Sequence, residues 1–231
     1  MRIDGRVLKK PAEEISEGEH TVEIKDTLAF VSRGGLKLEA ALDAFSVDAS
    51  AKRAIDVGAS TGGFTDCLLQ RGAFHVWAID SGEGQLAPSL RNDPRVTSIE
   101  RCNARYLAPE VIGEPVDLIV MDVSFISATY LIPRFRELLN VRGEAICLIK
   151  PQFEVGRSRI GKGGIVKDPS AHRMAIEKVL VCGREHGLTP IGLIPSPVKG
   201  GDGNREFLVH FTLQGDGNRE ITDREVRRVV G

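Results

Sequence analysis

Apolar segments of strand length alternate with segments of helix length along most of the chain, and this alternation is the strongest constraint on the fold. Strands that are apolar along their whole length are typical of parallel sheets covered on both faces. We therefore predict an α/β fold whose seven strands form a mostly parallel sheet with helices on both faces. The expected strands are 53–57, 76–79, 96–99, 116–121, 144–149, 191–195 and 207–212, and the expected helices are 31–45, 61–71, 128–139 and 171–185.

Turn and cap signals refine this expectation. Ser32 is a candidate N-cap for the first helix, and Asp168 followed by Pro169 is a stronger signal for the start of the last helix. A Gly-rich stretch separates the final two strands, which suggests a terminal hairpin with one antiparallel member. Upstream, Asp4-Gly5 indicates a tight turn, and 20–24 alternates like a short strand.

The chain of 231 residues is long enough for one large domain and a small appendage. We expect the main domain to span 31–213. Residues 1–30 are too few to hold a core of their own, and 214–231 are expected to be a charged tail.

Composition excludes several classes of protein. No apolar run approaches the roughly 18 residues of a membrane span and there is no secretion signal, so we expect a cytoplasmic protein. A metal site is not expected, because the cysteines are far apart: Cys67, Cys102, Cys147 and Cys182. The net charge of −1 argues mildly against nucleic acid. Residues 150–173 nevertheless hold six Lys or Arg against two acids, which fits either phosphate contacts or a solvated loop.

The most informative local motif is a glycine-rich turn at 56–64, which follows one expected strand and opens a helix. Its spacing, GxxxGG, matches neither the dinucleotide fingerprint nor the phosphate loop, which needs a Lys. An acid before the first glycine, Asp56, suits a ligand with an amino group and a sulfonium, and Asp80 ends the next strand where a carboxylate can accept ribose hydroxyls. These features predict S-adenosylmethionine. The expected cofactor residues are Asp56, Gly58, Ala59, Ser60, Gly62, Gly63, Phe64, Asp80, Asn103 and Asp122.

Among these, Asn103 has two interpretations. An amide in the loop after the third strand suits the edge of an adenine, whereas an Asn in a loop is also a common turn residue. A structural turn is likewise the alternative for the glycine motif as a whole.

Charged residues at the ends of apolar segments form a second group of candidates. Asp122 and Lys150 each follow an apolar strand, Glu206 precedes one, and Lys37 lies within the first helix. Charged side chains are rarely buried unless they are paired. Each of the four either marks a strand end that meets solvent or belongs to a reactive centre.

Several motifs, in order along the chain, resemble the TlyA (hemolysin A) family, whose members carry an FtsJ-type methyltransferase domain. The motifs are 31–38 (VSRGGLKL), 56–64 (DVGASTGGF), 84–86 (GQL), 122–127 (DVSFIS), 148–154 (LIKPQFE), 161–164 (GKGG) and 203–208 (GNREFL). The resemblance runs from about residue 1 to residue 213, and DVSFIS and LIKPQFE are its most specific parts.

This resemblance implies a Rossmann-like class I fold that uses S-adenosylmethionine to methylate the 2′-oxygen of a cytidine in 16S and 23S rRNA, or in 23S rRNA alone. The implied partners are rRNA and the ribosomal subunits. The family's Lys-Asp-Lys-Glu tetrad falls on Lys37, Asp122, Lys150 and Glu206. The hexapeptide GDGNRE occurs twice, but only the copy that ends at Glu206 precedes an apolar strand. The expected RNA-binding residues are Arg33, Arg157, Arg159, Lys162 and Lys167.

The chemistry of a ribose hydroxyl fits such a tetrad. A hydroxyl is a poor nucleophile until its proton is removed or shared, and a partly buried lysine can take the proton or hold the developing alkoxide. We assign that role to Lys150. Asp122 and Glu206 would orient the lysines, and Lys37 would add positive charge. No metal is required.

The chain departs from the family at its start. A full N-terminal module like that of ribosomal protein S4 has two helices before its hairpin, and this chain begins within the hairpin, so we expect weak binding to rRNA. Three rival functions are a membrane-active hemolysin, an inactive methyltransferase fold that binds ribosomes, and a nucleotide-dependent dehydrogenase. A hemolysin needs a long amphipathic or spanning segment, which the sequence lacks, and the glycine spacing disfavours a dehydrogenase.

Overall fold

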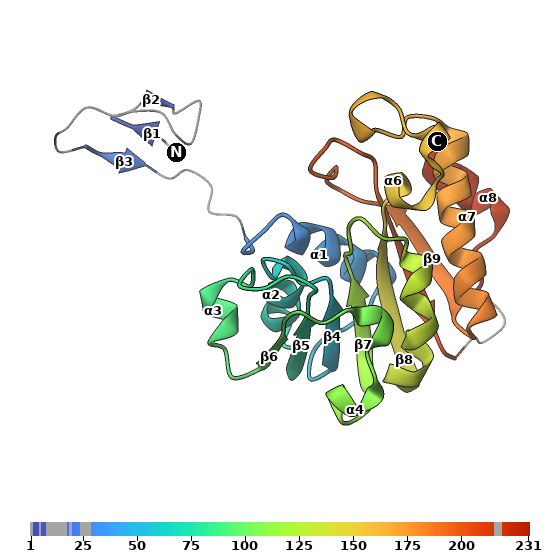
Figure 1. Ribbon diagram of the computed structural model, residues 1–231, viewed down its shortest axis with the longest axis horizontal. Helices are drawn as coiled ribbons and strands as arrows, with labels where there is room; N and C mark the ends of the chain where they lie inside the picture. The colour runs from blue at the N-terminus through green and yellow to red at the C-terminus, as the bar shows by residue number, and fades with distance from the viewer. Residues whose placement is uncertain (1, 5, 8–17, 19, 24–28, 215–218) are drawn as a thin grey trace.

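The computed structural model of the chain has a seven-stranded sheet at its centre, in the order β6-β5-β4-β7-β8-β10-β9 (Figure 1). It describes residues 2–4, 6–7, 18, 20–23, 29–214 and 219–231. Neighbouring strands from β6 to β8 are parallel, and β10 is antiparallel to both of its neighbours. The predicted fold class and its single antiparallel member are confirmed. The strands are β4 (Arg53–Val57), β5 (His75–Ile79), β6 (Val96–Ile99), β7 (Val116–Met121), β8 (Leu139–Ile149), β9 (Thr189–Pro195) and β10 (Phe207–Thr212).

Helices cover both faces of this sheet. Among the described residues they are α1 (Gly34–Phe45), α2 (Gly63–Gln70), α3 (Pro88–Arg91), α4 (Pro109–Ile112), α5 (Phe135–Leu138), α6 (Pro151–Glu154), α7 (Pro169–Glu185) and α8 (Asp223–Val230). Short 3-10 turns lie at Ala104–Tyr106, Ala128–Tyr130, Ile132–Arg134, Arg157–Arg159 and Lys162–Gly164.

The hydrophobic core has two parts, one on each face of the sheet. One part holds α1 and α2 against side chains such as Ala54, Val120, Leu148 and Leu208. The other holds α5, α7 and α8 against the alternate residues of the same strands, such as Phe207. Successive side chains of a strand point to opposite faces, so residues with odd numbers meet the helices on one face and residues with even numbers those on the other. We call this odd or even position of a residue its parity. We call these faces the α1 side and the α7 side.

The cap predictions have different outcomes. Helix α7 begins as predicted, with Asp168 accepting the Ser170 N–H at 2.9 Å and Pro169 in the first turn. Helix α1 begins at Gly34, and Arg33, not Ser32, holds the N-cap position. The Ser32 hydroxyl still accepts the Gly34 N–H at 3.3 Å, so it supports the turn that leads into the helix.

The predicted helix over 128–139 is wrong as one continuous element. Two 3-10 turns precede α5, and the helix ends at Leu138 because β8 already begins at Leu139. Pro133 lies within the second 3-10 turn. A proline has no N–H to donate to the preceding turn, which favours short helical pieces over one long helix.

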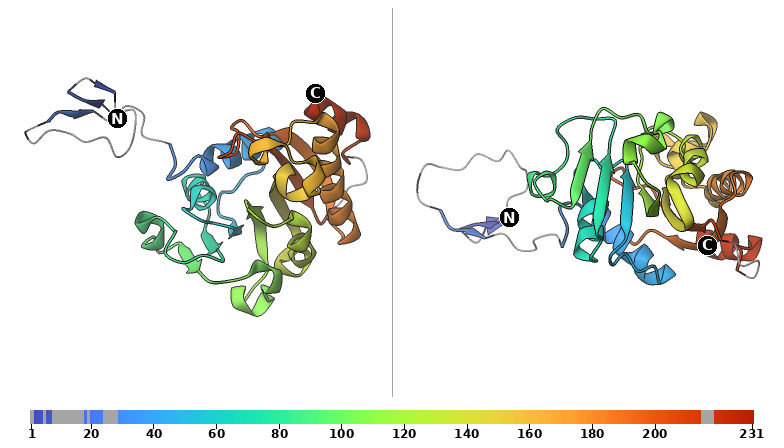
Figure 2. Two further views of the ribbon diagram at one scale, coloured as in Figure 1. Left: turned by 45° about the horizontal axis from the view of Figure 1, so that its top comes forward. Right: turned by 90° about the horizontal axis from the view of Figure 1, so that it is seen from below.

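The C-terminal segment, expected to be only a charged tail, forms helix α8. Thr222 and Glu225 make a reciprocal capping box at its start. The apolar residues of the segment are buried on the α7 side, and α8 packs against α7 and β9 (Figures 1 and 2). The charged residues hid this apolar stripe, because Arg227 and Arg228 separate Val226 from Val229 and Val230.

Three short strands form a separate small sheet near the N-terminus: β1 (Arg2–Ile3), β2 (Arg6–Val7) and β3 (Val22–Glu23). Ile3 pairs with Arg6, and Gly5 of the predicted turn lies outside the described residues. Asp4 accepts from the Thr21 N–H at 2.9 Å and contacts His20 at 2.7 Å, so it ties β1 to the start of β3. Most of the predicted partial S4-like module, including Pro11, lies outside the described residues.

Glu144 in β8 provides a test of stability against pH. It contacts His210 at 3.3 Å and Lys52 at 2.7 Å, and these partners, His210 foremost, lower its pKa to about 2. A carboxylate whose folded pKa is depressed stabilises the fold above its unfolded pKa, near 4.5, and the contribution is lost as the pH falls toward 2. We expect Glu144→Gln to lower the free energy of unfolding by about 1–2 kcal/mol at neutral pH, after allowance for partial exposure. Urea unfolding should show the two proteins converging as the pH falls from about 4.5; a difference that stayed constant with pH would contradict this account.

Candidate active site

The glycine-rich turn joins β4 to α2 and brings the backbone close to the end of β7. Gly58 has φ +84°, and a Cβ there would lie 2.5 Å from the Asp122 carbonyl oxygen, so only glycine fits. The N–H groups of Gly58 and Ala59 both donate to the Ile79 carbonyl, at 2.8 and 3.1 Å. The turn is therefore fixed between the ends of β5 and β7.

Two cavities open along this edge of the sheet and share part of the turn. The first, of about 430 Å³, contains Asp80 and Asn103 in its wall, and we call it the Asp80 cavity. The second, of about 260 Å³, contains Lys37 and Lys150, and we call it the Lys150 cavity. Four residues line both, so the cavities form one continuous cleft: Gly58, Ser60, Asp122 and Ser124.

The carboxylate of Asp80 organises the wall of its cavity. It accepts the Ser60 N–H at 2.8 Å and the Gly82 N–H at 2.7 Å. The Ser60 hydroxyl in turn donates to Gln85 at 3.1 Å. Asn103 lines the same cavity, and its side-chain oxygen accepts the Arg105 N–H at 3.2 Å. Asn103 is thus a turn residue that also lies in the wall of the cavity. This position agrees with a turn role and also with a contact to the edge of an adenine.

Asp56 does not line the cleft, contrary to its predicted contact with a ligand. It lies on the α1 side of β4 and is fully buried beneath α2. Its Oδ2 accepts both the N–H and the hydroxyl of Thr65, at 2.9 and 2.7 Å. Burial raises the pKa of this carboxyl to about 7. Asp56 therefore accepts a hydrogen bond from an N–H in the first turn of α2 that has no partner within the helix. This contact fixes the glycine turn from the buried side.

Of the other predicted turn residues, some line the cleft and one does not. Ala59, Gly63 and Phe64 line the Lys150 cavity. Gly62 is not among the lining residues of either cavity, because a Cβ on it would point at Leu90 and Leu86 instead. Its φ of +99° shows that it serves the sharp entry into α2.

The four charged side chains of the tetrad (Lys37, Asp122, Lys150 and Glu206) form one chain of ion pairs in the cleft. Lys37 Nζ contacts Glu206 Oε2 at 2.6 Å and Asp122 Oδ2 at 3.8 Å. Lys150 Nζ contacts Asp122 Oδ1 at 2.6 Å and donates to the Ser124 hydroxyl at 2.7 Å. The side chain of Glu206 is 2% exposed and that of Asp122 is 19% exposed. The Asp122–Lys150 end of this series of ion pairs is therefore the end that reaches the open cleft.

Strand order and residue parity explain why these side chains meet. Strands β7, β8 and β10 are neighbours, and Asp122, Lys150 and Glu206 follow or precede them at the same edge of the sheet. All three share parity with residues that face α1, the helix that carries Lys37. The antiparallel direction of β10 is what places a residue before its start beside residues that follow the ends of β7 and β8.

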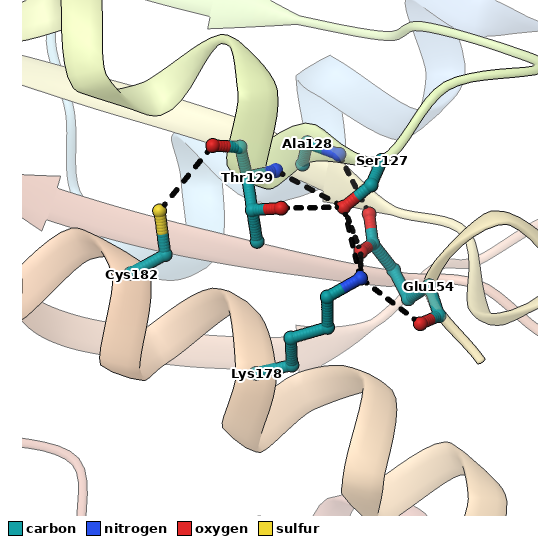
Figure 3. A network of polar contacts seen from close by, with 6 residues as sticks. All are labelled: Ser127, Ala128, Thr129, Glu154, Lys178 and Cys182. Atoms are coloured by element: carbon teal, nitrogen blue, oxygen red, sulfur yellow. Dashed lines mark hydrogen bonds and ion pairs between the residues drawn. The ribbon is translucent and has the colours of Figure 1, made fainter. Parts of the chain in front are cut away.

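A buried network fixes the loop after Asp122 (Figure 3). Glu154 accepts from the Ser127 hydroxyl at 2.5 Å and from the Ala128 N–H at 2.7 Å. Lys178 of α7 reaches the same carboxylate and the Ser127 hydroxyl, each at 3.1 Å. The last residues of the DVSFIS and LIKPQFE motifs thus hold each other, which keeps the 123–127 loop in the wall of the cleft.

We expect Glu154→Ala to lower the free energy of unfolding by about 2–4 kcal/mol, because Ser127, the Ala128 N–H and Lys178 would all lose a buried acceptor. Glu177→Ala is the matched control, since Glu177 pairs with Arg173 at 2.5 Å on the surface of α7, the helix that carries Lys178. Loss of this pair should lower the free energy of unfolding by about 1 kcal/mol or less. Urea unfolding of both variants measures the two costs, and equal costs would contradict the assigned role of the network.

The predicted RNA-binding residues fall into two places. Arg33 lines the Lys150 cavity. The other four are exposed on the segment after α6, and within the described part of the chain they form no ion pair: Arg157, Arg159, Lys162 and Lys167. Lys199 also lines the Lys150 cavity, and sequence reasoning missed it because it lies in a loop without a recognisable motif. Ser124 was also missed, although it lies within the DVSFIS motif.

Two other features bear on the class of protein. The described residues contain no group of three or more His, Cys, Asp or Glu side chains that could hold a metal ion. Within the same part of the chain, no helix is both long and apolar enough to cross a membrane.

Comparison with known proteins agrees with this geometry. The chain is 45% identical over 217 residues to the 16S/23S rRNA (cytidine-2′-O)-methyltransferase TlyA of Mycobacterium tuberculosis, covering 94% of this chain and 81% of that protein. It is also similar to the solved structure of a "putative hemolysin" from Lactococcus lactis, with a TM-score of 0.83 and 45% identity over 88% of this chain and 98% of the other.

A more distant likeness concerns the fold alone. The structure of Aeropyrum pernix fibrillarin in complex with S-adenosyl-L-methionine matches with a TM-score of 0.54 at 16% identity, over 77% of this chain and 76% of that chain. The fold is thus that of S-adenosylmethionine-dependent methyltransferases. Residues 30–213 match the FtsJ-like methyltransferase family. With this match and its close likeness to a TlyA protein, the chain belongs to the FtsJ-like methyltransferase family.

Proposed function

We propose that the protein transfers a methyl group from S-adenosylmethionine to the ribose 2′-hydroxyl of a cytidine in rRNA. The observation that carries the proposal is the tetrad, whose open end at Lys150 lies in a cleft continuous with the glycine turn. The relatives named as rRNA (cytidine-2′-O)-methyltransferases support the nature of the acceptor. An rRNA substrate would place the protein in the cytoplasm.

The Asp80 cavity fits the proposed cofactor. Its volume of about 430 Å³ lies in the range of small-molecule sites. Gly58 lines both cavities, and because it has no side chain its backbone is open to a ligand there. The Asp80 carboxylate is suited to ribose hydroxyls, and Asn103 to the adenine edge. When bound, S-adenosylmethionine supplies an already activated methyl group.

The Lys150 cavity fits the acceptor. A 2′-hydroxyl placed beside Lys150 Nζ would share its proton with that amine, while Asp122 and Ser124 hold the amine in place. Lys37 lies 3.8 Å from the other oxygen of Asp122 and keeps positive charge near the developing alkoxide. Glu206 holds Lys37 from the buried side at 2.6 Å. Positioning of the hydroxyl for in-line transfer supplies much of the remaining rate.

Basic side chains beside the acceptor cavity would bind the RNA backbone. Arg33 and Lys199 line the cavity itself, and the exposed basic residues after α6 extend the positive charge beyond it. Such contacts position a substrate without reading its bases.

The test is to incubate the protein with S-adenosylmethionine and separate small and large ribosomal subunits that lack the modification, and then to map 2′-O-methyl groups by mass spectrometry. The expected product is a 2′-O-methylcytidine at a defined position in at least one rRNA. A methyl group on a base, or none on either rRNA, would contradict the proposal.

A further inference from the structure

Arg205 connects the tetrad to the C-terminal helix. It immediately precedes Glu206 in the chain, and its guanidinium donates to two carbonyls in the last turn of α8. The bond from Nη2 to the Val229 oxygen is 2.7 Å, and Nη1 donates to the Val230 oxygen. Carbonyls at the end of a helix have no partner within it, and a cation there also complements the helix dipole. Arg205 therefore caps the C-terminus of α8.

Helix α8 offers a firm attachment for this cap. Its valines and Ile221 are between 1% and 8% exposed, and the Ile221 N–H donates to the Pro190 carbonyl at 3.0 Å. The Arg205 guanidinium also lies 5.4 Å from the centre of the Phe207 ring, within the range of a cation–π contact. The arginine fork is thus held by two carbonyls and one ring.

The two neighbouring side chains lie on opposite sides of the sheet. Arg205 shares the parity of Phe207, which packs on the α7 side with α8. Glu206 shares the parity of Leu208, which packs on the α1 side. The backbone at 205–206 is therefore anchored on both sides of the sheet. Arg205 binds α8, and Glu206 contacts Lys37 of α1 at 2.6 Å.

We propose that Arg205 is a positioning residue, which uses its grip on α8 to fix Glu206 and, through Glu206, the amine of Lys37. This inference assigns a function to a helix that lies beyond the matched residues 30–213, and its catalytic consequence rests on the proposed function. Without the grip, the backbone before β10 is free to shift, and Glu206 no longer holds Lys37 at one place in the cleft.

The first test does not depend on activity. The rate at which acetic anhydride acetylates Lys37 is measured by peptide mass spectrometry, with Lys52 as the internal control because its pair with Glu144 lies elsewhere on the sheet. In Arg205→Ala we expect Lys37 to react several-fold faster while Lys52 keeps its rate. Arg205→Lys, which keeps the charge but not the fork, should give an intermediate rate and guards against a misfolded alanine variant. An unchanged rate for Lys37 would overturn the proposal.

The second test is catalytic and uses Arg184→Ala as the matched control. Arg184 also ties down the C-terminal segment, through Glu220 at 2.5 Å, but does not touch the end of α8. In Arg205→Ala we expect kcat for methyl transfer to fall about tenfold, with KM for S-adenosylmethionine within about twofold of the original. Arg184→Ala should lower the melting temperature and keep kcat within about twofold. Equal losses of kcat in the two variants would show a merely structural role. If the unaltered protein transfers no methyl group, the proposed function fails, and the acetylation rates still decide whether Arg205 positions Lys37.

Discussion

Lys150→Ala should abolish methyl transfer while S-adenosylmethionine still binds. Removal of the amine takes away the group beside the acceptor hydroxyl and leaves Asp122 without its 2.6 Å partner in the open part of the cleft. We expect kcat to fall by about 1000-fold or more, the usual scale for loss of a positioned acid or base together with a nearby charge. Methyl transfer from labelled cofactor measures the loss, and calorimetry measures cofactor binding.

Lys52→Ala is the control for this experiment. Lys52 is also a half-buried lysine in a 2.7 Å ion pair, but its partner Glu144 is far from the cleft. The control should keep its turnover and lose only stability. If Lys150→Ala kept near-normal turnover, Lys150 would not be the group that activates the hydroxyl.

Gly58→Ala should remove cofactor binding and lower stability at once. The added Cβ would lie 2.5 Å from the Asp122 carbonyl oxygen and 2.9 Å from the Val123 side chain, and neither the backbone of β7 nor the turn can move without opening the cleft. The positive φ of +84° adds strain for any residue other than glycine. We expect a loss of about 3 kcal/mol or more in the free energy of unfolding and a loss of about 100-fold in affinity for S-adenosylmethionine.

Gly84→Ala separates the steric clash of the added Cβ from the backbone strain of a positive φ. Gly84 also has a positive φ, of +69°, but nothing lies within 4 Å of the position that its Cβ would take. This variant should show only the backbone cost, about 1 kcal/mol. The measurements are urea unfolding and calorimetry with the cofactor, and equal effects of the two substitutions would show that the close approach to Asp122 is unimportant.

The sequence predicted the sheet well because its strands are apolar along their whole length and its turns carry glycine. It also indicated all four members of the tetrad, but only the resemblance to a family joined them, since each alone reads as the polar end of a strand. The structure adds the physical reason: Asp122, Lys150 and Glu206 share one parity and one edge of the sheet.

Two of the errors concern the direction in which a residue faces. Asp56 was expected to face a ligand because it precedes the first glycine, but its parity turns it beneath α2. Gly62 was expected in the cleft and instead serves the entry into the helix. Helix α8 was missed because three valines among arginines look like a solvated tail until the neighbouring helix α7 is known. The assignment of individual residues to cofactor and RNA remains a prediction.

The position of β10 has a consequence for when the site forms during synthesis. The bond between Lys37 and Glu206 joins residues 169 positions apart, and β10 is made after β9 yet lies between β8 and β9. A nascent chain that has emerged only to the end of β9 therefore contains Lys37, Asp122 and Lys150 but not Glu206, the residue that holds Lys37 from the buried side. Contacts of such long range form late in folding. A protein whose proposed substrate is ribosomal RNA would thus acquire its reactive centre only when almost the whole chain has left the ribosome that makes it.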